Sequence, residues 1–413
     1  MCVAILALHC SATTAAAITV IPKHPAGQII PNRAGIAVFG NDDRIVLPRQ
    51  HAALKKSIGL VYSNTARSVC TGFCVADNVI ATAAHCLYRT AGERKPDLNH
   101  FRFRLHSTGS KRSTRIATVR GSSPQQFILS GSTRLNVKPP IDATRDWALM
   151  RLSSPLCRNS VLPVDAATPA DIAAHAAAGN LLHVSYHRNF HNWQLAFTAP
   201  CTAQSVDRSP KGRRIEHDFN DAHRLVLHTC DTGGGSSGSP LLMRTQGNSF
   251  RVVGLNVGTY VQTRMLLEKG KIVRRFKSDA IANTAVAAAA FNDHIALLAR
   301  AEILTRAPLL RELQRELSRR LLYRGSLDGI FGHATHAAIT AFEYRAGLPL
   351  TGLATRPLLR RLQSETRTGN YWSNTGRAQK PAVGHLAGTV KSPRPAGRAK
   401  PPSLLPAPPT QRP

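Results

Sequence analysis

Acidic residues are scarce in this chain of 413 residues, which has 23 Asp and Glu against 54 Lys and Arg. The formal net charge is therefore +31 and the sequence pI is near 11.0. A chain this basic is attracted to polyanions, such as a cell wall, an anionic membrane surface or nucleic acid. Two plainer explanations stay open: the charge maintains solubility, or it reflects genomic base composition.

Several signatures are missing from the sequence. It has no helix-turn-helix, zinc-finger or RNA-binding motif, so charge alone supports nucleic-acid binding and no specific nucleic acid is predicted. No apolar run beyond the N-terminus reaches the ~18 residues needed to span a bilayer, so no transmembrane segment is predicted. No CxxC pair with matching His or Cys partners occurs, so no metal site is predicted.

The N-terminus begins with a short apolar stretch, residues 2–9, followed by small residues up to Ala17. This pattern is typical of a signal peptide, although a basic first segment is missing. We expect residues 1–17 to be a signal peptide and residues 18–40 to be a propeptide or N-terminal extension. The alternatives are a start farther upstream and a buried N-terminal segment.

The chain has eight cysteines, and the loss of Cys2 and Cys10 with a signal peptide would leave six. An even number suits disulfide formation in an oxidising compartment. The sequence therefore favours a secreted or periplasmic protein, and its length is sufficient for two or more domains with cores of their own.

Three short strings contain the candidate catalytic residues. ATAAHC includes His85, DWALMRL begins at Asp146, and GSSGSP places Ser237 on a glycine-flanked turn. A serine hydroxyl becomes a nucleophile when a neutral imidazole takes its proton and a carboxylate holds that imidazole in the required tautomer. Each string alone has a plainer explanation: a structural histidine, the start of a half-buried strand, or a flexible linker. Together, in the order His, Asp, Ser, they favour a catalytic set.

These strings and their order resemble the chymotrypsin-like serine proteases, over residues 41–300, and the bacterial glutamyl-endopeptidase branch in particular. The resemblance implies that Ser237 attacks, His85 is the general base and Asp146 orients the imidazole. It also implies that the N–H groups of Gly235 and Ser237 form the oxyanion hole. The implied reaction requires no cofactor.

The same resemblance supplies four substrate-binding candidates, Asp231, Thr232, Asn256 and Gly258. Asp231 stands six residues before the nucleophile, at the offset of a carboxylate that attracts Lys and Arg. Thr232 matches a threonine that helps to bind Glu, but Asn256 replaces the histidine that completes that recognition. Three substrate preferences therefore stay open: for basic side chains, for acidic side chains, and for small or apolar side chains.

Three disulfides are expected: Cys70–Cys86 from the resemblance, Cys201–Cys230 on either side of the hairpin before the nucleophile, and Cys74–Cys157 as the remaining pair.

The fold expected for residues 41–300 is all-β. Short apolar runs separated by Gly, Pro and polar clusters predict short strands, at residues 57–62, 78–82, 224–228 and 250–255. The resemblance implies two six-stranded barrels with the catalytic groups in the cleft between them. The alanine-rich residues 279–301 predict a closing helix, because Ile295, Leu298 and Ala301 share a helical face.

A second pattern begins at Pro308, where leucines recur every three or four residues. Further helices are expected over 333–346 and 357–362, separated by the strings DGIFG and GLPLTG. This arrangement resembles the small three-helix peptidoglycan-binding module, over residues 307–365. A three-helix bundle without a ligand is the alternative.

The last segment, residues 366–413, contains mostly Pro, Ala, Gly and polar residues, with eight Lys or Arg and no acidic residue. This composition predicts a disordered basic tail.

The sequence thus predicts a secreted or periplasmic serine endopeptidase that is held at the cell wall. Its expected partners are a protein or peptide substrate, peptidoglycan, and a polyanionic surface for the tail. Two alternatives stay open: a hydrolase of peptidoglycan stem peptides, and a non-catalytic wall-binding protein.

Overall fold

The computed structural model describes residues 27–30, 37–88, 97–107, 110–115, 123–206, 215–246, 249–268 and 271–367. The predicted signal peptide, part of the N-terminal extension and nearly all of the basic tail lie outside these residues. Among the described helices, none has the length and apolar character needed to cross a bilayer.

The first sheet has seven strands in the order β7-β6-β3-β4-β5-β9-β8. Its strands are β3 (Ile58–Ser63), β4 (Ser68–Ala76), β5 (Val79–Thr82), β6 (Arg102–Ser107), β7 (Ser110–Arg115), β8 (Ile128–Ser130) and β9 (Ala148–Arg151). Most residues of β3, β5 and β9 are buried in succession, which explains why their sequences are continuous apolar runs and not alternating ones.

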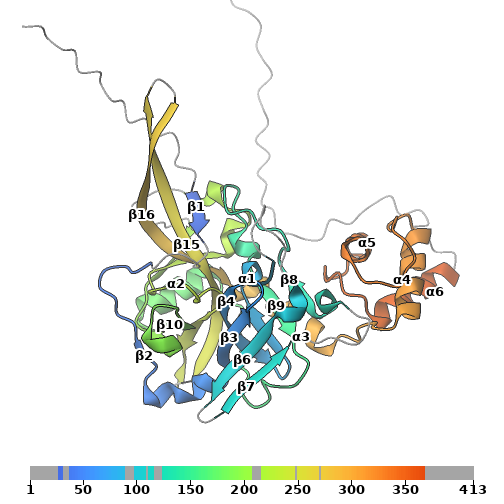
Figure 1. Ribbon diagram of the computed structural model, residues 1–413, viewed down its shortest axis with the longest axis horizontal. Helices are drawn as coiled ribbons and strands as arrows, with labels where there is room; N and C mark the ends of the chain where they lie inside the picture. The colour runs from blue at the N-terminus through green and yellow to red at the C-terminus, as the bar shows by residue number, and fades with distance from the viewer. Residues whose placement is uncertain are drawn as a thin grey trace, which may run out of the picture. The chain divides into compact units, whose positions relative to one another are not determined.

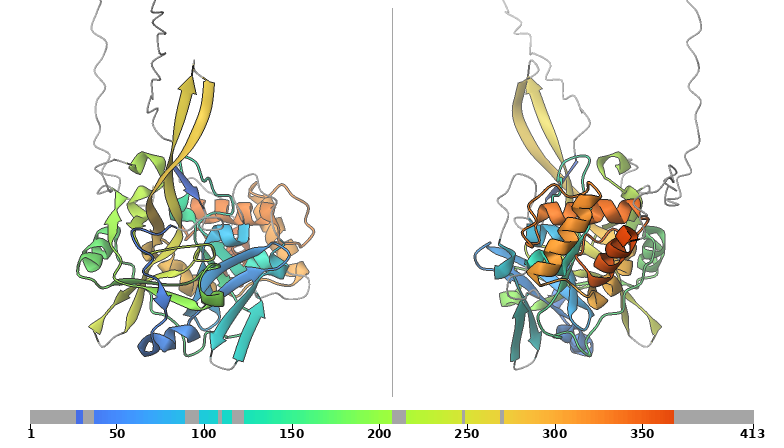
Figure 2. Two further views of the ribbon diagram at one scale, coloured as in Figure 1. Left: turned by 60° about the vertical axis from the view of Figure 1, so that its left-hand side comes forward. Right: turned by 90° about the vertical axis from the view of Figure 1, so that its right-hand side faces the viewer.

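The second sheet has nine strands in the order β12-β13-β16-β15-β14-β10-β11-β2, with β1 also paired to β15. Its strands are β1 (Gly27–Ile30), β2 (Ile45–Val46), β10 (Leu181–Tyr186), β11 (Leu195–Thr198), β12 (Ala203–Ser205), β13 (Leu225–His228), β14 (Pro240–Arg244), β15 (Phe250–Glu268) and β16 (Lys271–Ala287). Strands β15 and β16 form a long hairpin that extends beyond the other strands of this sheet (Figures 1 and 2).

Every pairing between these strands is antiparallel, and helices follow the two sheets along the chain. The predicted fold class is therefore confirmed. The sheets have seven and nine strands instead of six each: β7, from the region between residues 88 and 140, extends the first, and β1 and the two-residue strand β2 are among the additions to the second.

The alanine-rich stretch corrects one expectation. Residues up to Ala287 belong to β16, and the closing helix α3 covers only Asn292–Arg300. Alanine favours helices in isolation, but here residues 282–287 are buried and hydrogen-bonded to β15, so tertiary pairing overrides local preference.

Three disulfides join Cys70 to Cys86, Cys74 to Cys157 and Cys201 to Cys230, the same pairs that were expected from the sequence. The first links β4 to α1 (Ala84–Tyr88), and the third links β12 and β13 at their ends. Helix α2 (Pro169–Ala177) contacts the second sheet and begins with a capping box between Thr168 and Asp171.

The last three helices have a separate apolar core. They are α4 (Ala307–Arg319), α5 (His333–Arg345) and α6 (Arg356–Arg367), close to the predicted helices. The buried Gln314 side chain holds the turn after α4: it donates to Asp328 Oδ1 at 2.9 Å and accepts from Gly329 N–H at 2.8 Å. Glu343 accepts from the N–H groups of Thr351 and Gly352, so this carboxylate braces the GLPLTG loop.

Candidate active site

His85 and Asp146 are brought together by the pairing of β5 with β9. Thr82, at the end of β5, lies opposite Ala148, at the start of β9. His85 comes three residues after Thr82 in α1, and Asp146 comes two residues before Ala148. The two side chains therefore meet at the same end of the first sheet, although 61 positions separate them in the sequence.

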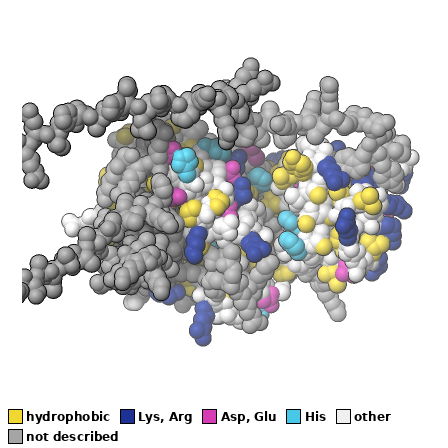
Figure 3. Space-filling model, turned by 90° about the horizontal axis from the view of Figure 1, so that it is seen from above, with side chains coloured by type: hydrophobic (Ala, Val, Ile, Leu, Met, Phe, Trp, Pro, Cys, Tyr) yellow, Lys and Arg dark blue, Asp and Glu magenta, His cyan; other side chains and the backbone are white. Residues whose placement is uncertain are grey.

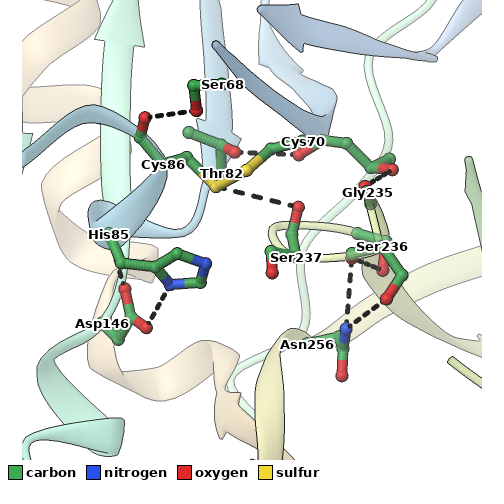
Figure 4. The surroundings of a disulfide bond; sticks show 12 residues. Ser68, Cys70, Thr82, His85, Cys86, Asp146, Gly235, Ser236, Ser237 and Asn256 are labelled. Carbon is green, nitrogen blue, oxygen red and sulfur yellow. Dashed lines mark hydrogen bonds and ion pairs between the residues drawn. A yellow bond between two sulfur atoms is a disulfide. The ribbon is translucent and has the colours of Figure 1, made fainter. Parts of the chain in front are cut away.

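Two hydrogen bonds connect these residues. Asp146 Oδ2 lies 2.6 Å from His85 Nδ1, and Asp146 Oδ1 accepts from the His85 backbone N–H at 2.8 Å. Because a carboxylate only accepts, Nδ1 carries a proton and Nε2 of a neutral ring has a free lone pair. Both side chains are buried, and the Nε2 side of the ring points toward Ser237 (Figure 4). The pair is thus arranged as a base with its acceptor side open.

Ser237 lies on a tight turn between β13 and β14 that only glycine permits. Gly235 and Gly238, on either side of the serine, have φ of +107° and +82°. A Cβ on Gly238 would lie 2.3 Å from Thr82 Oγ1 and 2.4 Å from Thr71 O, so any side chain there would clash with the first sheet. The turn holds Ser237 with its hydroxyl buried and without a hydrogen-bond partner among the described residues.

The backbone around Ser237 leaves two N–H groups available. Within the part of the chain that the structure describes, neither Gly235 N–H nor Ser237 N–H donates a hydrogen bond. The carbonyl groups of the same residues are held: Gly235 O accepts from Thr71 Oγ1 at 2.9 Å, and Ser237 O accepts from Thr71 N–H at 2.9 Å. These two N–H groups are therefore available to a substrate oxygen, as donors of an oxyanion hole must be.

Two family models match parts of this chain. Residues 70–255 match the trypsin-like peptidase domain, and residues 306–362 match the peptidoglycan binding domain. The protein carries a trypsin-like serine peptidase domain followed by a peptidoglycan-binding domain. A solved structure of a Glu endopeptidase in complex with MPD is 18% identical, with a TM-score of 0.41, covering 63% of this chain and 98% of that chain. No curated protein matches the sequence.

Thr71 connects the first sheet of the peptidase to residues 235–238, here called the nucleophile turn because they include the candidate nucleophile Ser237. Besides its two bonds to that turn, its hydroxyl accepts from Tyr186 N–H at 3.0 Å, and its carbonyl accepts from Thr82 Oγ1 at 2.8 Å. The residue is completely buried. One threonine therefore fixes the backbone of both residues that offer the free N–H groups.

We expect Thr71→Val to lower kcat about tenfold, with little change in KM, because the loss of its hydroxyl releases the Gly235 carbonyl and loosens the backbone of a residue whose own N–H is a candidate oxyanion donor. The buried Tyr186 N–H also loses its acceptor, which costs about 1–3 kcal/mol in the free energy of unfolding. Steady-state kinetics and denaturant unfolding measure the two effects. Thr71→Ser keeps the hydroxyl and is the control; equal kcat values in the two variants would contradict this role.

Cys70, His85 and Cys86 have ligand-type atoms within 4.8 Å of one another. Both sulfur atoms belong to one disulfide, so neither is a thiolate that could bind a metal ion. Their grouping instead places the disulfide beside the active site, where Cys86 Sγ lies 4.0 Å from Ser237 O.

Asp231 does not present a free carboxylate to a substrate in this structure. Its Oδ1 accepts from Phe39 N–H at 3.0 Å, and its Oδ2 accepts from Asp43 N–H at 3.1 Å. The side chain is 1% exposed. Partial burial, with the nearby Asp231 carboxylate, raises the pKa of Asp43 to about 6. Asp231 therefore anchors the segment that precedes the peptidase sheets.

Thr232 belongs to a buried amide network. Its hydroxyl donates to Asn283 Oδ1 at 3.0 Å, and the hydroxyl of Thr259 donates to the same oxygen at 2.6 Å. The Asn283 amide nitrogen donates to Cys230 O at 2.7 Å and to Ala37 O at 3.4 Å. All four hydrogen-bonding positions of the Asn283 amide are thus filled.

Asn256 braces the nucleophile turn from β15. Its amide nitrogen donates to Ser236 O at 3.1 Å, and its Oδ1 lies 3.1 Å from His228 Nε2. Gly258, two residues farther along β15, accepts from Thr284 Oγ1 through its carbonyl at 3.0 Å. Asn256 and Gly258 are thus parts of β15, whereas Thr232 lies outside the named strands, in an isolated bridge with Ala37.

Three buried histidines form a cluster behind the nucleophile turn. His183 Nε2 lies 2.6 Å from Ser239 Oγ, and His187 Nε2 lies 2.7 Å from Ser185 Oγ. The His183 ring centroid is 6.3 Å from that of His187 and 6.1 Å from that of His228. Burial lowers the pKa of His187 to about 3 and that of His228 to about 4, and it also lowers the pKa of His183. The cluster is therefore uncharged at neutral pH.

Sequence reasoning did not identify Thr71, Asn283 or the histidine cluster. The cluster has a signal that could have been used: His183, Ser185 and His187 alternate along β10 and its end, so they share one face. Asn283 has no comparable signal, since its partners come from distant segments.

Proposed function

We propose that the protein is a secreted serine endopeptidase in which Ser237, His85 and Asp146 form the catalytic triad. The observation that supports this best is the 2.6 Å contact between Asp146 Oδ2 and His85 Nδ1, with the other ring nitrogen directed at an unpartnered serine hydroxyl. Six of the eight cysteines are in disulfides, which is consistent with an oxidising compartment.

In the proposed reaction, His85 Nε2 takes the Ser237 proton as the serine oxygen bonds to the substrate carbonyl carbon. Asp146 stabilises the imidazolium, and the N–H groups of Gly235 and Ser237 bind the oxyanion. The imidazolium then protonates the leaving amine, the peptide bond breaks and an acyl-enzyme remains. Water, activated by His85, hydrolyses this ester and restores the serine.

A fluorophosphonate probe tests the triad without knowledge of the natural substrate. It reacts with an activated serine, so we expect mass spectrometry to locate the adduct on Ser237. A folded sample without any adduct would instead favour the non-catalytic wall-binding alternative. If an enzyme preparation that reacts with the probe also releases muropeptides from purified sacculi, the stem-peptide alternative is favoured.

We also propose that residues 307–365 hold the enzyme on peptidoglycan. In the view of Figure 3, basic and hydrophobic side chains share the surface of this domain, and acidic ones are few. Tyr344, on α5, is 68% exposed, so its ring is available to a ligand. An exposed aromatic face of this kind suits contact with a sugar or peptide strand.

We expect the protein to cosediment with purified sacculi, and Tyr344→Ala to weaken this binding severalfold. The measurement belongs at about 1 M salt, where the screening length falls to about 3 Å and the attraction of the +31 charge to an anionic wall is suppressed. Leu321→Ala, at an apolar residue that is 82% exposed in the same domain, is the control. Equal losses in both variants, or loss of all binding at high salt, would contradict a specific domain site.

A further inference from the structure

The N-terminal segment adds a strand to the second sheet. β1 pairs antiparallel with β15: Gly27 lies opposite Gln262, and Ile30 lies opposite Thr259. β16 pairs with β15 from Gly254 to Glu268, so one edge of β15 is fully used. β1 therefore occupies the other edge, and Figure 1 shows it alongside the base of the long hairpin.

This edge of β15 begins next to the turn that contains Ser237. β14 begins at Pro240, three residues after Ser237, and pairs with β15 only as far as Leu255. The turn itself is bonded to the next residue, since Gly238 N–H donates to Asn256 O at 2.7 Å. Beyond Asn256, β14 no longer covers the edge. The part of β15 that follows Asn256 is thus a strand edge that begins beside the turn of Ser237.

An extended peptide can bind such an edge by adding a strand, because its main chain then completes the sheet. Thr259 lies three residues past Asn256, or about 10 Å at the rise of a β-strand. A peptide on this edge would place residues three or four positions from its reacting bond opposite Thr259. β1 fills this place, and its direction from Gly27 to Ile30 runs toward the nucleophile.

A second anchor holds the same segment on the other flank of the turn. Ala37 and Thr232 exchange two backbone hydrogen bonds, at 3.1 and 3.0 Å. Phe39 and Asp43 donate their N–H groups to the buried Asp231 carboxylate. The N-terminal segment is thus attached both to β15 and to the residues just before the nucleophile.

We propose that Gly27–Ile30 is an intramolecular ligand of the peptide-binding edge of β15, and that extended peptide substrates compete with it. This inference rests on the proposed serine endopeptidase function. A pair of strands four residues long binds weakly, but a tethered segment acts at an effective concentration in the millimolar range. The enzyme with its N-terminal segment in place is therefore inhibited toward extended peptides, and much less toward small reagents that reach Ser237 without using the edge.

The test replaces main-chain donors without shortening the chain. The double substitution Ile29→Pro and Ile30→Pro removes two successive N–H groups, one of which faces β15 in any antiparallel register. Ile29→Ala with Ile30→Ala keeps both N–H groups and is the matched control. All three chains are assayed with denatured casein as the extended substrate and with a fluorophosphonate as the small reagent.

We expect the proline chain to hydrolyse casein about tenfold faster than the other two, with equal fluorophosphonate labelling rates in all three. Equal casein rates in chains that label equally would overturn the inhibition by β1 and leave the triad in place. If the alanine chain hydrolysed casein as fast as the proline chain, the role of the main-chain pairing would be overturned. Failure of all three to label would overturn the serine mechanism, and the competition with it.

Discussion

Replacing Ser237 by alanine is expected to abolish peptide hydrolysis, with a loss of several orders of magnitude in kcat. The variant should stay folded, because the Ser237 hydroxyl is buried without a hydrogen-bond partner among the described residues. Removing an unpartnered buried hydroxyl leaves no other group unsatisfied, so the free energy of unfolding should stay the same or rise slightly. Casein hydrolysis and urea unfolding measure the two quantities on one preparation.

Ser236 provides the matched control for this result. Its hydroxyl donates to Gly233 O at 2.9 Å, so it is committed to the turn and is not available for attack. We expect Ser236→Ala to lose stability and to keep most of the activity that Ser237→Ala lacks. Residual hydrolysis by Ser237→Ala, at a rate above that of the fluorophosphonate-treated enzyme, would remove this serine from the mechanism.

Acid is expected to destabilise the protein by several kcal/mol between pH 6.5 and 4, through the buried histidines. In the unfolded chain, histidines take up protons near pH 6.5, whereas in the folded protein His187 and His228 resist protonation down to about 3 and 4. The unfolded state therefore binds more protons as the pH falls, and the free energy of unfolding falls with it. A pKa difference of one unit corresponds to about 1.4 kcal/mol, so two such groups produce a large effect.

The double variant His187→Gln and His228→Gln should flatten this pH dependence, since glutamine keeps a polar group and does not titrate. Urea unfolding at a series of pH values compares it with the wild type and with His223→Gln, which alters an exposed histidine. The His223 curve should follow the wild type. Parallel curves for the wild type and the double variant would show that the acid loss arises elsewhere.

The sequence predicted best what local chemistry determines. The glycine pattern around Ser237 has a direct counterpart in the positive φ angles of Gly235 and Gly238. The leucine repeat after Pro308 produced α4 with its buried side facing the core of the small domain. In both cases the local geometry depends on residues that are close together in the sequence.

What the sequence could not reveal depends on contacts between distant segments. The alanine-rich residues 279–301 predict a helix, and only the pairing with β15 shows why residues 279–287 are the end of strand β16. Asp231 was a candidate for recognising basic side chains, yet its carboxylate holds two backbone N–H groups nearly two hundred positions earlier in the chain. Hydrogen-bond partners at that separation leave no periodicity or spacing to be recognised.

Asn283 determines the direction of two hydroxyl protons. Because its nitrogen faces the carbonyl oxygens of Cys230 and Ala37, its oxygen faces the hydroxyls of Thr232 and Thr259, and both hydroxyls donate inward. An aspartate at position 283 would place a carboxylate oxygen against the carbonyl oxygens of Cys230 and Ala37, so an amide fits this position and the acid of the same shape does not.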